Sequence, residues 1–144
     1  MAYFKTCRLL PEDAVYIRKR VFMEEQGFSD EFDDTDAIAA HIVLYNEENK
    51  PIATCRYFWD GKYKAYVVGR IAVLKEFRKR HFGAALLREA ERQIQNRGAN
   101  RLLLAAQVQA RSFYEKQGYT PMGEEFLEEH CLHIWMCKKL VVQE

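Results

Sequence analysis

The chain has 144 residues, of which 49% are hydrophobic and 30% charged, and its formal net charge is +1. This length predicts one domain over residues 1–144 with a sizeable core, and the balanced charge argues against partners bound by bulk electrostatics, such as nucleic acid or a membrane surface. The chain has neither an apolar signal-peptide segment near its start nor a run of eighteen apolar residues, so a cytoplasmic protein is expected.

The first half of the chain predicts a strand, a helix and then two paired strands. Residues 3–9 alternate as in a strand, and a helix over 11–26 begins at a proline with two acidic residues in its first turn. An acidic loop over 28–35 follows, and strands over 40–45 and 52–58 are joined by a polar turn. One face of the helix is apolar and carries Ala14, Ile17, Val21 and Phe22.

The second half predicts alternating strands and helices. The expected elements are a buried strand over 65–74, a basic turn over 75–81, a helix over 82–97, a strand over 101–107, a helix over 109–118 and a strand over 130–140. The resulting order, β-α-β-β-β-α-β-α-β, predicts an α/β fold. Its sheet is mixed and mostly antiparallel, with six to seven strands flanked by helices.

The basic turn over 75–81 is a candidate anion site. It carries four Lys or Arg side chains and His81, and it leads directly into the start of a helix. The first N–H groups of a helix lack helical partners, and the helix dipole adds partial positive charge there. Gly83 is expected to let the backbone approach an anion closely. Phosphate is the natural ligand, and a solvated surface loop is the alternative.

The charges are distributed unevenly. Residues 21–49 include nine Asp and Glu but no Lys or Arg, whereas residues 75–101 include eight basic residues and three acidic ones. Acidic loops are usually solvated, which is the main expectation for residues 28–35. The alternative is that this stretch borders the binding site of a cation, with Asp33 among the groups that contact it.

The cysteines do not form a metal-binding or redox motif. Cys7, Cys55, Cys131 and Cys137 include no CxxC pair, and three of them lie in apolar strand-like segments. Buried free thiols are therefore expected. His133 lies between two of these cysteines, but strand spacing of this kind is weak support for zinc, and no metal is predicted.

Two motifs at a fixed separation identify a family resemblance. Ile-Ala-Val at 71–73 is followed, after four residues, by Arg-x-x-His-x-Gly at 78–83, and residues 107–119 read Gln-Val-Gln-Ala-x-x-Phe-Tyr-Glu-Lys-x-Gly-Tyr. Together they resemble the GCN5-related N-acetyltransferase (GNAT) superfamily over the whole chain. The segment VFMEEQG, the strand AHIVLY and His133 before IWM resemble the small bacterial subgroup of the ElaA and YjcF type.

The resemblance implies acetyl-CoA as co-substrate and places its contacts on particular residues. The backbone of Ile71, Ala72 and Val73 would pair with the pantetheine arm, and Gln107 would contact its amide. Tyr114 would lie near the thioester sulfur and protonate the departing thiolate, a reaction suited to a phenol. The pyrophosphate would be held by the backbone of Arg78, Lys79, Arg80, His81, Phe82, Gly83 and Ala84.

His81 departs from the family pattern, which has a glycine at this position of the loop. A Cβ there narrows the permitted backbone conformations. A frame shifted by two residues, Arg80-x-x-Gly83-x-Ala85, also matches the pattern. The frame beginning at Arg78 is preferred because it keeps the usual spacing from Val73.

The acceptor side of the site is less constrained by motif. The predicted catalytic residues are Tyr114 as acid, with Glu25 and His133 as candidates for the base. Glu25, His41 and Asp33 are the predicted substrate contacts, and the substrate is expected to be a small cationic amine or a basic side chain. No cysteine can be tied to the thioester, so direct transfer is favoured over a covalent acetyl-enzyme.

Three functions compete at this stage. The leading one is an acetyl-CoA-dependent N-acetyltransferase, and the alternative is a non-catalytic CoA-binding sensor or interaction module on the same fold. A nucleic-acid binder is the poorest, because the basic turn lacks an aromatic platform. Exposure of Ile134 and Trp135 on the last strand would allow a homodimer.

Overall fold

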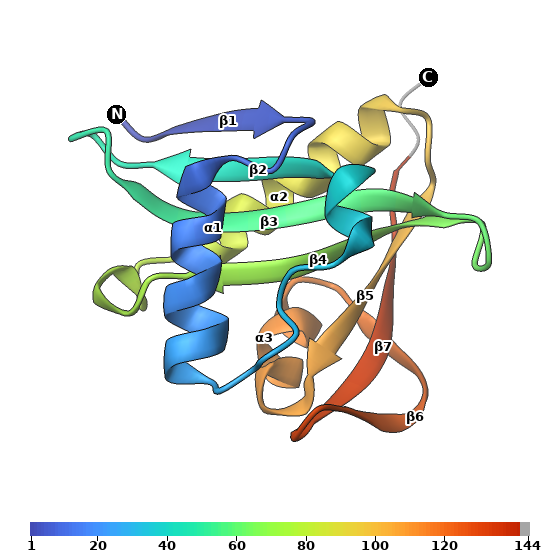
Figure 1. The fold of residues 1–144 in the computed structure, drawn as a ribbon. Helices are drawn as coiled ribbons and strands as arrows, with labels where there is room; N and C mark the ends of the chain where they lie inside the picture. Colours follow the sequence, from blue (N-terminus) through green and yellow to red (C-terminus); the bar gives the residue numbers. More distant parts are fainter. Residues whose placement is uncertain (142–144) are drawn as a thin grey trace.

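The computed structural model describes residues 1–141, which form one seven-stranded sheet with helices on both faces (Figure 1). The strand order is β1-β2-β3-β4-β5-β7-β6, and every neighbouring pair is antiparallel except β4 and β5. The strands are β1 (Tyr3–Cys7), β2 (Ala40–Tyr45), β3 (Pro51–Asp60), β4 (Ala65–Val73), β5 (Arg101–Gln107), β6 (Thr120–Glu128) and β7 (Cys131–Lys139).

The helices divide between the two faces of the sheet. Helix α1 (Glu12–Arg18) continues as a π-helix (Lys19–Glu25) across one face, and α2 (Phe82–Asn96) lies behind the other, near α3 (Arg111–Lys116) (Figure 1). Short 3-10 turns occupy Asp34–Ala37, Lys75–Phe77 and Val108–Ala110.

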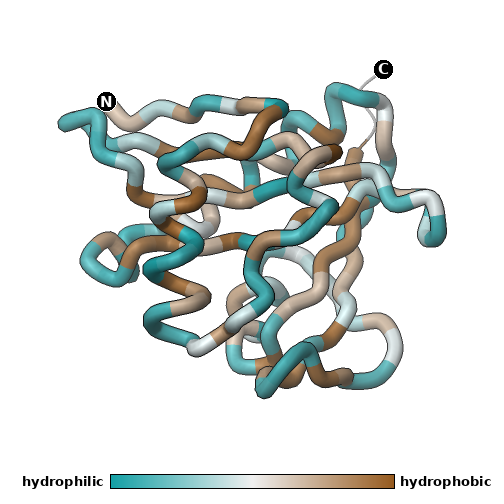
Figure 2. The backbone as a smooth tube through the Cα atoms, viewed as in Figure 1, coloured by the Kyte–Doolittle hydropathy of each residue, from teal (hydrophilic) through white to brown (hydrophobic). Residues whose placement is uncertain are grey.

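Alternation along the strands supplies two cores, one for each face. On β2, Ile42 and Leu44 pack in the core that includes α2, while Val43 and Tyr45 pack against α1. Because successive side chains of a strand point to opposite faces, one apolar strand serves both cores. Figure 2 shows the hydrophobic segments along the strands, with hydrophilic turns at the ends of the β2–β3 and β3–β4 hairpins.

The sheet opens in its middle. Strands β4 and β5 pair only where residues 66–68 face residues 102–104, and both strands continue beyond this point without pairing to each other. A bulge in β4 accompanies the separation, since two β4 residues, Arg70 and Ile71, stand opposite the single residue Cys55 of β3. Arg70 adopts a φ of 54°, and such bulges bend a strand and redirect its side chains. The result is a wedge between β4 and β5.

The predicted fold class is confirmed, but two elements differ from expectation. The second half of the first helix is π-helical, a form that periodicity does not distinguish from α. Strand β6 was not predicted as an element of its own. It contains Pro121 and Gly123, pairs only with β7 at the sheet edge, and is exposed on nearly every residue, so it lacks the usual alternation.

Two predictions about burial are wrong. Ile134 is only 4% exposed because it packs in the α2-side core, and Trp135 is half-buried beside Tyr63 and Phe126. The argument for a dimer through these residues therefore fails. Among the four free cysteines only Cys55 is buried; the others are partly exposed, because they lie on strand ends or on the sparsely covered β7. Within residues 1–141, no helix combines the length and apolar character needed to cross a membrane.

Candidate active site

A cavity of about 480 Å³ lies where β4 and β5 separate. Its walls come from the end of the π-helix, the loop after it, both separating strands, β7 and the turn between β6 and β7. Of the residues predicted for the site, Ile71, Gln107, Tyr114 and His133 line this cavity. The other predicted site residues do not line it: Glu25, Asp33, His41, Ala72, Val73 and the loop over 78–84.

Tyr114 reaches the cavity from the opposite side of the sheet. It packs in the core shared with α2 and is 8% exposed, yet it lines the cavity through the gap between the strands. Burial, with a smaller effect from Cys55, raises the pKa of its phenol well above the usual range. Its hydroxyl makes no hydrogen bond to another residue within 1–141, so the neutral phenol keeps its proton available for donation.

The loop before α2 has the backbone form of an anion site. Lys79 and His81 have φ values of 65° and 63°, and His81 is the N-cap of α2. The first hydrogen bond of the helix runs from the Ala85 N–H to the His81 carbonyl, so the N–H groups of 82–84 precede it. His81 thus adopts the left-handed conformation that a glycine would adopt, and its side chain is exposed. This favours the frame that begins at Arg78.

Gly83 is packed against neighbouring side chains at the start of α2. A Cβ built on it would lie 3.5 Å from Phe113 Cζ and 3.7 Å from Val73 Cγ2, both ordinary contacts. Its Cα therefore faces the packing between α2, β4 and α3. The packing there has room for an alanine Cβ, and no positive φ is required.

Arg78 joins the loop to the first helix. Its Nε donates to the Val73 carbonyl at 2.9 Å, and its two terminal nitrogens donate to the two carboxylate oxygens of Glu25 at 2.8 and 2.9 Å. Bidentate pairs of this kind are strongly oriented. Glu25 is thus engaged in positioning the loop, which argues against a role as free base.

The acidic loop is pinned by three arginines, which we call the arginine cluster: Arg18, Arg56 and Arg70 with Glu31, Asp33 and Asp36. Arg18 and Arg56 share Asp36 Oδ1 at 2.8 Å each, and Arg70 Nε lies 3.0 Å from Glu31 Oε2. The cluster pairs three positive with three negative charges. The expectation of a solvated loop over 28–35 is wrong for Glu31, which is 4% exposed, and Asp36, just after the loop, is 7% exposed.

The arginine cluster also determines the surroundings of two predicted substrate contacts, Asp33 and His41. Asp33 accepts two hydrogen bonds from Arg56, and although burial opposes ionisation, these bonds lower its pKa. Its charge is compensated, so it is not a free partner for a cation. His41 is buried beneath the cluster, where its Nε2 lies 2.9 Å from the Asp36 carbonyl oxygen, and burial lowers its pKa. Both geometries favour structural roles.

Gln107 links the end of β5 to the first helix. Its Nε2 donates to Gln26 Oε1 at 2.7 Å, while Gln109 Nε2 donates to Gln107 Oε1 at 2.7 Å. On the neighbouring strand its register partner is His133. The amide and the imidazole therefore lie side by side at the mouth of the gap.

Comparison with known proteins identifies the family. The family model described as an acetyltransferase (GNAT) domain matches residues 13–140. This chain belongs to the GNAT acetyltransferase family. GNAT proteins are acyltransferases, and the mixed seven-stranded sheet is the one expected from the resemblance.

Individual relatives of this GNAT chain support the subgroup. The uncharacterized N-acetyltransferase YjcF of Bacillus subtilis (strain 168) is 36% identical over 130 residues, covering 88% of this chain and 91% of YjcF. The crystal structure of Escherichia coli ElaA superposes with a TM-score of 0.84 at 21% identity, over 96% and 99% of the two chains. An aminoglycoside 6'-N-acetyltransferase complexed with coenzyme A has a TM-score of 0.72 at 12% identity, over 99% of both.

Sequence reasoning missed the arginine cluster and the carboxylates at the cavity mouth of this GNAT domain. One signal was available, since Arg18 falls four residues after Ala14 and three before Val21, on the apolar stripe of its helix. A charged residue on such a stripe must be paired. Asp30, Glu128 and Glu129 line the cavity, but no local pattern distinguishes them from surface acids.

Proposed function

We propose that this GNAT acyltransferase uses acetyl-CoA to acetylate a primary amine by direct transfer. The substrate is a small molecule or a protein side chain. The observation that carries the proposal is the position of Tyr114 in the gap between β4 and β5. The gap thus offers a strand edge and a proton donor, and the loop before α2, whose Gly83 packs toward Phe113, is the candidate phosphate site.

The residues of this chain fit acetyl-CoA. Beyond Val68 the edge of β4 facing β5 is unpaired, so the backbone of residues 69–73 can bind the amides of the pantetheine arm. The N–H groups of 82–84 and the positive end of the α2 dipole suit the pyrophosphate. The aminoglycoside 6'-N-acetyltransferase of the same fold is complexed with coenzyme A.

The cavity residues supply the proton steps of a direct transfer. A neutral amine attacks the thioester carbonyl, and the departing thiolate takes the proton of the Tyr114 hydroxyl. Because the pKa of this phenol is raised, the hydroxyl is protonated at neutral pH. None of the four cysteines lines this cavity, and burial raises the pKa of the Cys55 thiol. An acetyl-cysteine intermediate is accordingly not part of the proposal. Four free thiols also suit the reducing cytoplasm, where we place the protein.

The test combines binding with turnover. Calorimetric titration of the wild-type chain should show binding of acetyl-CoA and of CoA, and Gly83→Trp should abolish both because the indole would displace the start of α2 from Phe113. Tyr114→Phe should retain binding and lower kcat for thiol release by about 100-fold. Binding without turnover for any amine would instead support a non-catalytic CoA-binding module. An absence of binding would refute the proposal.

A further inference from the structure

His133 is the only one of the four histidines that lines the cavity between β4 and β5, and all four lie within the described residues. It is 5% exposed and stands on β7, where its register partner Gln107 also faces the cavity. Ile134, the next residue, points to the α2-side core. The alternation of β7 therefore turns His133 toward the cavity, together with Trp135.

The surroundings of His133 define its tautomer. Its Nδ1 lies 3.0 Å from the backbone carbonyl oxygen of Cys131, and a carbonyl can only accept, so Nδ1 carries a proton. The neutral ring then presents the lone pair of Nε2. Phe126 stacks on the ring at 5.9 Å between centroids, and Phe28 meets it edge-on at 6.5 Å, so the orientation is held.

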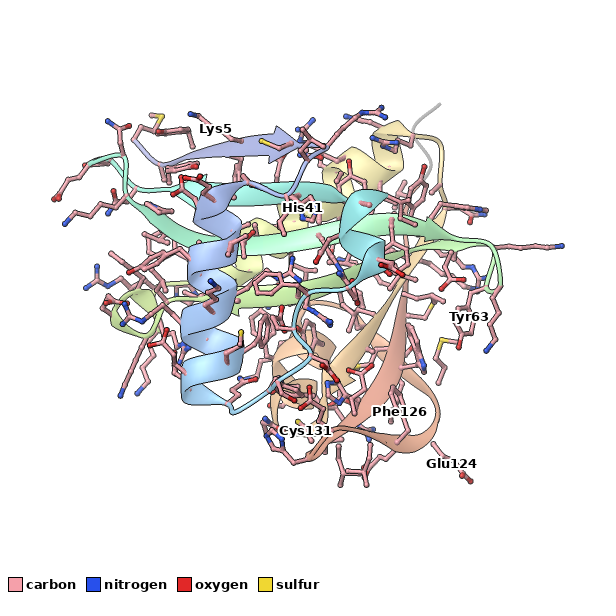
Figure 3. The ribbon with its side chains drawn as sticks, viewed as in Figure 1. Lys5, His41, Tyr63, Glu124, Phe126 and Cys131 are labelled. Carbon is pink, nitrogen blue, oxygen red and sulfur yellow. The ribbon has the colours of Figure 1, made fainter. Side chains whose placement is uncertain are left out.

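Nε2 faces a carboxylate and has no hydrogen bond of its own to residues 1–141. Glu128 Oε2 lies 3.6 Å away, so a single ammonium nitrogen can contact both atoms from the side at hydrogen-bond distance. The Glu128 side chain is 52% exposed and has no Lys or Arg partner among the described residues. Figure 3 shows that Phe126 lies beside β7 while Glu124, on the same strand as Glu128, projects away from the protein.

The other charged side chains that line the cavity leave a net negative charge near His133 and Glu128. Arg56 and Arg70 are engaged by the carboxylates of the arginine cluster, including Glu31. Glu129 accepts hydrogen bonds from the N–H groups of Ser29 and Asp30. These neutral donors fix the position of the carboxylate but leave its negative charge uncompensated. Asp30 has no basic partner within residues 1–141. An ammonium group is the ligand that such a surface favours.

We propose that Glu128 binds the ammonium of the acceptor and that His133 Nε2 takes its proton, which makes His133 the general base. This inference rests on the proposed acetyl transfer. The N–H bond breaks toward Nε2, the freed nitrogen lone pair forms the C–N bond, and the C–S bond breaks as Tyr114 donates its proton to sulfur. The attached nitrogen gives up its second proton to the Tyr114 phenolate, which restores the phenol, and solvent takes the proton from the imidazolium, so one proton is released per acetyl group transferred.

The decisive experiment is the pH profile of thiol release with a primary amine such as butylamine, under saturating acetyl-CoA. His133→Gln should lower kcat/KM by about 100-fold at neutral pH and should remove the rising limb that a general base contributes to the pH profile. Its rate should approach that of the wild type above the pKa of the free amine, because no base is then needed. A merely structural role for His133 would lower the rate equally at every pH.

Two controls separate the possible outcomes. Glu128→Gln should raise KM for the amine about tenfold with little change in kcat, whereas Glu124→Gln, exposed on the same strand, should change neither. Glu25→Gln should keep the wild-type pH profile, since Glu25 is engaged with Arg78. Acetyl-CoA binding should be retained by His133→Gln, Glu128→Gln and Glu124→Gln, and its absence in the wild type would refute the acetyl transfer itself. If binding and turnover persist but His133→Gln keeps the profile, only the assignment of the base fails.

Discussion

Replacing Arg18 by Met removes the most buried charge of the arginine cluster while keeping much of the side-chain volume. Arg18 is 1% exposed and donates four hydrogen bonds: to Glu31 Oε2 at 2.7 Å, to Asp36 Oδ1 and Oδ2 at 2.8 and 3.1 Å, and to the Glu31 carbonyl at 3.1 Å. Breaking a buried ion pair from one side costs about 3–5 kcal/mol, because the remaining charge loses its partner.

The expected loss lies at the lower end of this range. Arg70 still contacts Glu31, and Arg56 still contacts Asp36, so neither carboxylate is left without a cation. We expect Arg18→Met to lower the free energy of unfolding by about 3 kcal/mol, which for a chain of this length lowers Tm by about 10 °C. The loop that forms one wall of the cavity should also loosen, raising KM for the amine and leaving acetyl-CoA affinity unchanged.

Urea unfolding at pH 7, followed by tryptophan fluorescence, measures the stability. Arg20→Met is the matched control, since Arg20 is 43% exposed and contacts the exposed Glu24 at 3.8 Å. Exposed pairs contribute little, so its loss should stay below about 0.5 kcal/mol. A loss below about 1 kcal/mol for Arg18→Met, with an unchanged denaturant dependence, would refute the view that the cluster stabilises this loop.

Two further predictions address the acid side of the cluster and the phosphate loop. Burial opposes ionisation of Asp36, but hydrogen bonds from Arg18 and Arg56 outweigh it and lower the pKa to about 2. The ionised carboxylate therefore stabilises the fold above about pH 4, the pKa of an Asp in the unfolded chain, and this stabilisation is lost as the pH falls toward 2. The difference in free energy of unfolding between wild type and Asp36→Asn should shrink by about 2 kcal/mol from pH 5 to pH 2. A constant gap in urea unfolding would contradict this. His81→Gly should change CoA affinity less than threefold by calorimetry, because His81 already has a glycine-like φ of 63°; a tenfold gain would show that its side chain obstructs the loop.

Local patterns in the sequence were informative wherever one segment contains the whole signal. Residue spacing alone predicts three consecutive elements: the strand over 65–74, the basic turn and the helix that follows. The motif around Tyr114 is recognised in the same way. Strand β6 shows the limit of this approach. Its pairing with β7 alone makes it a strand, and that pairing is invisible in a run of exposed acidic residues.

The same distinction applies to the residues of the candidate site. The family and the mostly antiparallel α/β sheet follow from the sequence alone, and so do the proposals of a phosphate loop and of Tyr114 as acid, because periodicity and motif spacing are properties of neighbouring residues. The folded structure was needed to show that Glu25 is engaged with Arg78, that three carboxylates in and beside the acidic loop are paired with arginines, and that His133 faces the cavity. These features depend on which side chains the folded chain brings together. Paired charges such as Arg18–Glu31 and Arg78–Glu25 are separated by 13 and 53 residues in the sequence, so they leave no local pattern.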